Sequence, residues 1–184
     1  MRDYDMASTD LNEFIEIYNP NPVSLDLSSF AVVLATNNAN EYLRVPLTGI
    51  TLDAGSATPP PGSFLVIGSA TLIATVPAMV HTITFAKTQD NITNTSSNPT
   101  GIAIIDTTNN TVVDSVSFGP GTAGVVAQIT GFSGKTTFAE GTFKSINDSG
   151  TAKSCARHPN GTDNDDLSTD WVLQTTPNPG VANP

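Results

Sequence analysis

The feature that most constrains this chain is a series of short apolar segments that alternate with period two and end at strand-breaking residues. In residues 13–18, Ile15 and Ile17 fall on one face of an extended segment, because successive side chains of a strand point to opposite sides. Asn-Pro-Asn-Pro follows at 19–22. Proline has no N–H to donate to a sheet ladder, so the strand is predicted to end there.

Similar segments recur along the whole chain. Further strands are expected at residues 23–27, 30–34, 42–47, 64–67 and 80–85. Residues 101–118 predict a hairpin around a Thr-Asn-Asn-Thr turn, because Asn tolerates positive φ. Two more strands are expected, one that starts at Ser154 and runs toward the polar loop beginning at Gly161, and one around Trp171. No amphipathic helix is predicted, and many short strands with turn signals indicate an all-β sandwich or barrel.

The remaining segments are predicted to be loops. Residues 1–11 are acidic and loop-like, and 55–63 form a loop with a stiff polyproline centre. Residues 87–101 are rich in Asn, Thr and Ser and are expected at the surface. Residues 119–153 are rich in Gly and Thr, and we interpret them as a long excursion that carries short strands.

Charge and length exclude some classes of protein. The 184 residues suit one domain with a real core, and the formal net charge is −10 with only 7 Lys and Arg. The basic residues are scattered, which argues against nucleic acid as a partner. A single cysteine rules out an internal disulfide. No segment is apolar and long enough to insert in a membrane, and no signal peptide is visible at the start.

The polar loop after residue 160 is a candidate calcium site. Asp163, Asp165 and Asp166 offer hard oxygen ligands, which suit Ca²⁺. The central Gly and terminal Glu of an EF-hand loop are missing. The alternative is a loop of Asx turns, in which these carboxylates accept local backbone hydrogen bonds.

Two residues near this loop are expected to have structural roles. Arg157 is predicted to be partly buried and therefore to need a carboxylate, with Glu16, Asp163 and Asp170 as candidates in that order. We expect it to clasp the C-terminal strands to the N-terminal strand. Trp171, the only Trp, is predicted to plug one end of the core, and a surface ligand platform is the alternative.

No pattern in the chain predicts catalysis. Cys155 and His158 could form a nucleophile and base, but no third group is implied, and a buried small Cys155 is favoured. Glu13 and Glu16 point to opposite faces of one strand and cannot flank one bond. Phosphate-loop, zinc-protease and serine-hydrolase motifs are missing. A metal-dependent hydrolase using the acidic loops is kept as an alternative.

The chain resembles the lamin-tail domain family, in its bacterial, secreted form. The resemblance rests on residues 12–20, 25–30, 62–68, 113–118, 140–142 and 154–183, of which the last segment is the most specific. Three features depart from the family pattern. The first strand is missing before residue 11, Ser29 stands where Gly is more usual, and the loops at 87–101 and 119–139 are long.

This resemblance implies an immunoglobulin-like β-sandwich with long loops. Residues 1–184 would form a single domain, either excised from a larger protein or beginning at a genuine start with a truncated first strand. The implied function is a non-catalytic accessory module of an exported or cell-surface bacterial protein. It would bind a protein or a surface polysaccharide through its loops. A calcium-stabilised structural spacer is the alternative, and no cofactor is required beyond a possible calcium ion.

Overall fold

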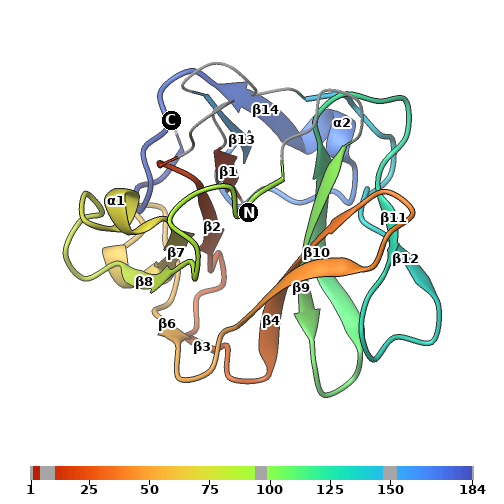
Figure 1. Ribbon diagram of the computed structural model, residues 1–184. Helices are drawn as coiled ribbons and strands as arrows, with labels where there is room; N and C mark the ends of the chain where they lie inside the picture. The colour runs from red at the N-terminus through yellow and green to blue at the C-terminus, as the bar shows by residue number, and fades with distance from the viewer. Residues whose placement is uncertain (1, 5–10, 94–98, 147–152, 184) are drawn as a thin grey trace.

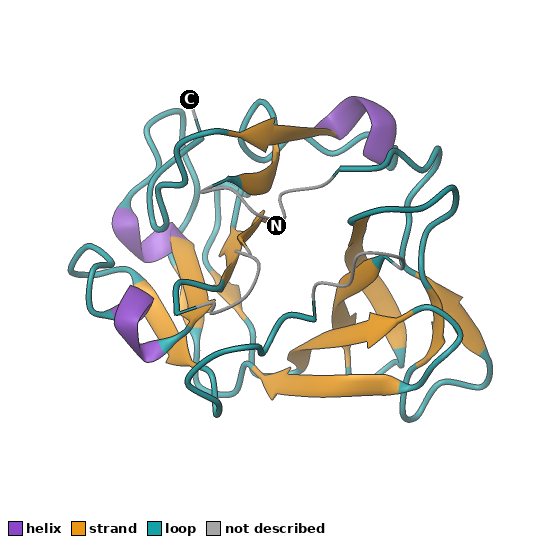
Figure 2. Cartoon of the chain, turned by 45° about the horizontal axis from the view of Figure 1, so that its top comes forward, coloured by secondary structure: helices purple, strands orange, loops and turns teal. Residues whose placement is uncertain are grey.

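The computed structural model describes residues 2–4 (as backbone), 11–93, 99–146 and 153–183. The fold is all-β: short strands form several sheets, and the described helices have only three or four residues each. Figures 1 and 2 show two groups of strands facing each other, with loops and short helices around them. The prediction of an all-β chain is therefore confirmed.

The larger sheet contains both ends of the chain. Its strand order is β14 (Trp171–Gln174), β13 (Ser154–Arg157), β1 (Arg2–Tyr4), β2 (Phe14–Tyr18), β7 (Phe64–Gly68) and β8 (His81–Thr84). All neighbours are antiparallel except β7 and β8, which are parallel. The C-terminal strands thus lie beside the N-terminal ones, although they are far apart in sequence (Figure 1).

The second sheet has the order β10 (Thr111–Phe118), β9 (Thr100–Asp106), β4 (Phe30–Thr36) and β5 (Glu41–Pro46). Two small antiparallel pairs complete the strands: β3 (Leu25–Asp26) with β6 (Thr51–Leu52), and β11 (Val126–Gln128) with β12 (Lys135–Thr137). The helices are η1 (Pro61–Ser63), α1 (Ala70–Ile73) and α2 (Leu167–Asp170).

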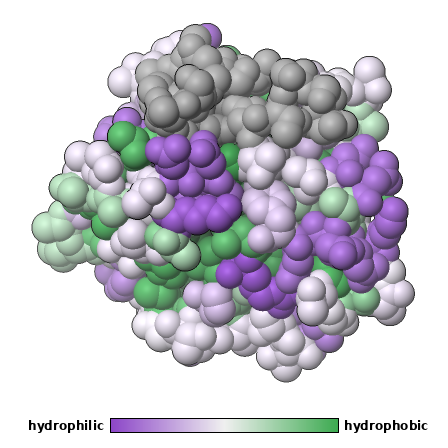
Figure 3. All heavy atoms as spheres, in the orientation of Figure 1, coloured by the Kyte–Doolittle hydropathy of each residue, from purple (hydrophilic) through white to green (hydrophobic). Residues whose placement is uncertain are grey.

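The inner faces of the two larger sheets share the main core. Ile15 and Ile17 face this core together, as their alternation predicted, and Trp171 is fully buried in it. The sheets contribute residues such as Leu65, Ile67, Val32, Leu34, Ile102 and Ile104. Figure 3 shows apolar side chains in the middle of this face of the molecule, with strongly hydrophilic groups above them and to the right.

Each larger sheet also buries part of its outer face. Val33 and Ala103 of the second sheet pack under Val125, Ile129 and Phe138 from the long 119–153 segment. The strands β11 and β12 lie in this segment, beside the second sheet (Figures 1 and 2). The apolar residues of the described part of this segment, 119–146, therefore cover a sheet face that would otherwise meet water. Residues 147–152 of the predicted excursion lie outside the described residues.

The outer face of the larger sheet is covered in a similar way. Phe14, Phe64 and Val66 form a second small core with Leu72 of α1 and with Val80. Phe14 precedes Ile15 and points to the opposite side of the same strand, as period two requires.

Four sequence expectations are corrected. Residues 2–4 form β1, where a loop and a missing first strand were expected, and the rest of that loop (5–10) lies outside the described residues. The strand at 23–27 is reduced to Leu25–Asp26. Two one-turn α-helices occur, although none was predicted. Asn91 and Ile92 are buried in a segment expected at the surface.

Candidate functional site: an arginine with four carboxylates, beside a cavity

Arg157, the last residue of β13, is the centre of the most charged region of the described structure. Its side chain is only 5% exposed. The guanidinium forms four ion pairs, with Asp114 at 2.7 Å, Glu140 at 2.9 Å, Asp163 at 2.7 Å and Asp170 at 3.2 Å. These carboxylates come from β10, the 138–146 loop, the loop after β13 and α2, so one side chain joins four separate segments.

The partners of Arg157 differ from the expected order. Asp163 and Asp170 are confirmed, but Glu16, the first candidate, is not among the ion pairs of Arg157. Glu16 is buried and accepts a hydrogen bond from the backbone N–H of Gly180 at 2.5 Å. A strand directs alternate side chains to opposite faces, and Glu16 is turned toward the C-terminal tail. Arg157 therefore joins the C-terminal segments to β10 of the second sheet, and its clasp does not include β2.

Asp170 and Trp171 fix the guanidinium from within the core. Asp170 is 1% exposed and accepts hydrogen bonds from the backbone N–H and the side-chain amide of Asn164, both at 2.7 Å. The Arg157 guanidinium carbon lies 5.3 Å from the ring centroid of Trp171, within cation–π range. The prediction that Trp171 plugs the core is confirmed, and the same ring also contacts the charged site.

The carboxylates around Arg157 have pKa values shifted in opposite directions, upward for Glu140 and downward for Asp170. Burial and the nearby charge of Asp114 raise the pKa of Glu140 above its usual range. Burial also favours neutral Asp170, but hydrogen bonds from Asn164 outweigh it and lower the pKa of Asp170. Burial disfavours the Arg157 cation as well, yet the surrounding carboxylates, Asp114 first, raise the pKa of Arg157. Among the described residues, Arg157 is the cation in the ion pairs of these four carboxylates, so within this part of the chain their negative charge exceeds the positive charge beside them.

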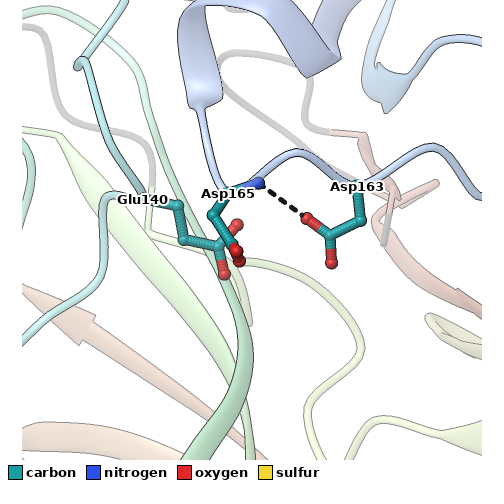
Figure 4. A group of neighbouring side chains, drawn as sticks. All are labelled: Glu140, Asp163 and Asp165. Carbon is teal, nitrogen blue, oxygen red and sulfur yellow. Dashed lines mark hydrogen bonds between the residues drawn. The ribbon is translucent and has the colours of Figure 1, made fainter.

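Two of the three predicted calcium ligands converge with a third group. One carboxylate oxygen each from Glu140, Asp163 and Asp165 lies within 4.8 Å of the others. Figure 4 shows the three side chains turned toward a common point, and the backbone N–H of Asp165 donates to Asp163 at 3.2 Å. Oxygens bound to one Ca²⁺ at 2.3–2.6 Å lie at most about 5 Å apart, so the spacing fits this ion. The set is partial, and further ligands would be waters or carbonyls.

Asp166, the third predicted calcium ligand, is not part of this group. It is the N-cap of α2: one carboxylate oxygen accepts from the backbone N–H of Ser168 at 2.8 Å and from its hydroxyl at 2.6 Å. The other oxygen accepts from the backbone N–H of Thr142 at 3.3 Å. Hydrogen bonds from Ser168 lower the pKa of Asp166. The Asx-turn alternative therefore describes this residue correctly.

The sequence analysis did not identify Glu140 as a site residue, although the glycine that follows it is a signal in the sequence. Gly141 has φ +54°, and a Cβ at this position would lie 2.6 Å from the carbonyl oxygen of Asp165. Only glycine allows the two loops to approach so closely. The approach brings Glu140 to Asp163 and Asp165, and the Leu167 N–H donates to the Glu140 carbonyl at 3.0 Å.

A cavity of about 370 Å³ adjoins the ion-pair cluster, which is within the size range of small-ligand pockets. Its apolar lining comes from both sheets and includes Ile17, Leu25, Leu27, Phe30, Leu47 and Ile104. Asp114, Arg157 and Asp163 of the cluster also line it. The cavity therefore combines an apolar interior with one charged wall.

Two asparagines that line the cavity contain buried polar atoms without a hydrogen-bond partner. These atoms are Nδ2 of Asn160 and Oδ1 of Asn183. The other amide atom of Asn183, Nδ2, donates to the backbone carbonyl of Arg157 at 3.0 Å. Buried polar groups are normally paired, so these two indicate a place where hydrogen bonds remain to be made.

The pairs considered for catalysis are separated in the structure. Cys155 is fully buried in the main core, whereas His158 lies in the loop after β13 and its backbone N–H donates to the Asp170 carbonyl. Glu13 and Glu16 bind different segments, since Glu13 accepts from Asn91 and Ile92 and Glu16 accepts from Gly180. Neither pair forms an acid–base arrangement.

Within the described ranges, none of the helices has the length and apolar character needed to cross a bilayer. No protein-family model matches the chain. A search of curated proteins likewise gives no match. The candidate site is therefore interpreted from its own chemistry.

Proposed function

We propose that this chain is a non-catalytic interaction module with an immunoglobulin-like β-sandwich of the lamin-tail type. It would belong to an exported or cell-surface bacterial protein and bind a protein or a surface polymer through its loops. Two sheets that face each other across one core support the sandwich part of the proposal. The resemblance in residues 154–183 supports the family, the bacterial source and the location outside the cell.

The cavity beside Arg157 is the observation that carries the binding function. Loop residues such as Pro20, Asn21 and Gly161 line it together with strand residues from both sheets. Loops presented by a rigid β scaffold are the usual place for recognition. An apolar cavity with a few polar groups is likewise the usual form of a binding site.

Blocking the cavity tests this function. Val113 lines the cavity and is 53% exposed, so Val113→Trp adds bulk there without overfilling the core. Met79, 78% exposed between α1 and β8, is not a lining residue, so Met79→Trp is the matched control. The probes are purified bacterial cell-wall polysaccharide and a defined peptide array.

We expect wild type and Met79→Trp to bind at least one probe equally, and Val113→Trp to bind roughly tenfold more weakly, about 1.4 kcal/mol. Circular dichroism and thermal unfolding check that both variants fold. Equal binding by all three proteins, or binding by none of them, would reject the loop-cavity function.

The cluster of Glu140, Asp163 and Asp165 favours a second function, a calcium-stiffened spacer. Calcium that binds only the folded chain raises the unfolding temperature by mass action. We expect millimolar calcium to raise Tm relative to chelator, and Asp165→Asn to remove the increase.

Asp165 is the best residue to change, because its carboxylate is not an ion-pair partner of Arg157. Asp26→Asn is the control, since Asp26 accepts hydrogen bonds only from its neighbour Ser28 among the described contacts. A Tm that is the same in calcium and in chelator for wild type would contradict the spacer function.

A further inference from the structure

The charge beside the cavity is unbalanced. Glu140, Asp163 and Asp170 each make their ion pair with Arg157, and none pairs with a second basic residue in the described part of the chain. Three carboxylates therefore share one positive charge, even before Asp114 is counted. Because Glu140 is half-buried and Asp170 is buried, water screens their charge less than it would at the surface. A ligand with a positive charge would reduce this excess.

The interior of the cavity is apolar, so the part of a ligand that lies there must differ in chemistry from the part that lies at the charged wall. Leu25, Leu27 and Phe30 line it from one side, and Ile17 and Ile104 come from the two facing sheets. An inorganic cation or a fully hydrated sugar would leave this apolar surface in contact with water. An aliphatic chain would cover it and gain about 25 cal/mol for each Å² removed from water.

The unpaired amide atoms indicate what the aliphatic chain is attached to. Nδ2 of Asn160 lacks an acceptor, and Oδ1 of Asn183 lacks a donor. Both atoms are covered by neighbouring atoms, so the two side chains must turn to meet a ligand in the cavity. A peptide group supplies both, through its carbonyl oxygen and its N–H. A free alkylamine supplies no acceptor for Asn160.

We propose that the cavity receives a basic side chain of a partner polypeptide, an aliphatic stem that ends in a cation. The stem lies against the apolar lining, the cation lies at the wall formed by Asp114 and Asp163, and the adjoining peptide group pairs with Asn160 and Asn183. Lysine has this form, a compact charge on a four-carbon stem. This inference rests on the binding function proposed above and specifies its ligand.

Three tripeptides with blocked ends test the proposal: acetyl-Gly-Xaa-Gly-amide, in which Xaa is lysine, norleucine or glutamate. Norleucine keeps the four-carbon stem and removes the charge. Backbone amide shifts of the ¹⁵N-labelled protein measure binding. We expect saturable shifts at Gly161, Asn183 and Val113 with the lysine peptide, binding roughly tenfold weaker with norleucine, and none with glutamate. Added salt should weaken only the lysine peptide.

Two carboxylates, one at the cavity and one outside the cluster, give the matched variants. Asp163 lines the cavity and is 46% exposed. Asp90 is exposed, does not line the cavity, and belongs neither to the ion pairs of Arg157 nor to the group of Glu140, Asp163 and Asp165. Asp163→Asn should weaken the lysine peptide and leave the norleucine peptide unchanged. Asp90→Asn, which makes the same change in net charge, should leave both unchanged. Equal effects of the two substitutions on the lysine peptide would mean a general charge effect and would overturn the assignment to the cavity.

The outcomes separate this inference from the function on which it rests. Equal binding of lysine and norleucine peptides, or binding of a glucosamine oligomer in their place, would reject the basic side chain but keep a binding cavity. If no peptide binds but Val113→Trp still weakens binding to the cell-wall or array probe, the proposed ligand is rejected and the binding cavity is kept. No binding of any peptide together with full probe binding by Val113→Trp would reject both.

Discussion

Two buried polar regions of this molecule are built in different ways. Glu13, fully buried, accepts hydrogen bonds from the backbone N–H groups of Asn91 and Ile92 at 3.0 and 2.9 Å and from the Asn91 side chain at 2.8 Å. It holds the 87–93 segment against the larger sheet. The region around Arg157 uses ion pairs, collects four carboxylates on one guanidinium and adjoins a cavity.

The difference shows how a structural site can be told from a candidate binding site. The Glu13 region directs amide donors at both oxygens of a single carboxylate, which is enough to bury it. The Arg157 region has surplus negative charge, a raised pKa for Glu140 and unpaired amide atoms nearby. Surplus charge and perturbed pKa values are typical of functional sites. We therefore expect the first region to matter only for stability and the second for both stability and binding.

The largest effect is expected from Arg157→Ala. It leaves Asp170 buried without its cation, and breaking a buried ion pair costs about 3–5 kcal/mol. Denaturant unfolding measures the change. Arg44→Ala is the control, because the Arg44–Glu41 pair at 2.8 Å is more exposed and such pairs contribute about 0.2–1 kcal/mol. Equal losses for the two variants would remove the central role given to Arg157.

A smaller loss is expected from Glu13→Ala. It leaves the N–H groups of Asn91 and Ile92 without their acceptor, at about 1–3 kcal/mol for each buried donor. Glu13→Gln keeps one acceptor oxygen and should lose less. Hydrogen exchange at Ile92 should increase in Glu13→Ala, whereas peptide binding at the cavity stays unchanged. Weakened peptide binding in this variant would break the distinction between the two regions.

Glu140 and Glu41 should affect the pH dependence of stability in opposite directions. Because the pKa of Glu140 is raised in the folded protein, its contribution is present below the ordinary pKa and lost as pH rises through the raised pKa. The pKa of Glu41 is lowered: burial opposes this, but the Arg44 hydrogen bond and others prevail. Its contribution is therefore present above the ordinary pKa and lost as pH falls through the lowered one.

The wild-type protein should therefore lose stability as the pH rises from the pKa of an ordinary glutamate toward neutral pH. Glu140→Gln should not show this loss. Glu41→Gln should lower stability at neutral pH, by less than about 1 kcal/mol, and match wild type in acid. Thermal unfolding across pH measures both. Parallel profiles for the two variants would show that Glu140 does not carry the surplus charge assigned to it.

The smallest effect is expected from Asp166→Ala. This change removes the N-cap of α2, a helix of only four residues, so Tm should fall slightly. The decrease should be the same in calcium and in chelator, because Asp166 lies outside the Glu140 cluster. A decrease in Tm that appears only in calcium would show that Asp166 is a calcium ligand after all.

The sequence by itself determined the strands and the faces that they bury. Period-two alternation at 13–18 and the strand breakers at 19–22 located β2 and oriented Ile15 and Ile17, since these signals act between neighbours in the chain. The same reasoning identified Trp171 as a core residue and Asp163 and Asp170 as partners of Arg157. It failed for β1, whose three residues gain their extended form from pairing with β2 and β13.

Only the tertiary structure decided the composition of the site. Asp114 and Glu140 lie 43 and 17 residues from Arg157, and no local pattern connects them. Glu16 was the first candidate partner for Arg157, but the face of β2 on which it lies directs it to Gly180. The cavity and its unpaired amides likewise arise where two sheets and the C-terminal tail meet. Strand periodicity is a property of adjacent residues, whereas a charged site is a property of distant segments packed together, so the sequence specifies the first directly and the second only through the fold.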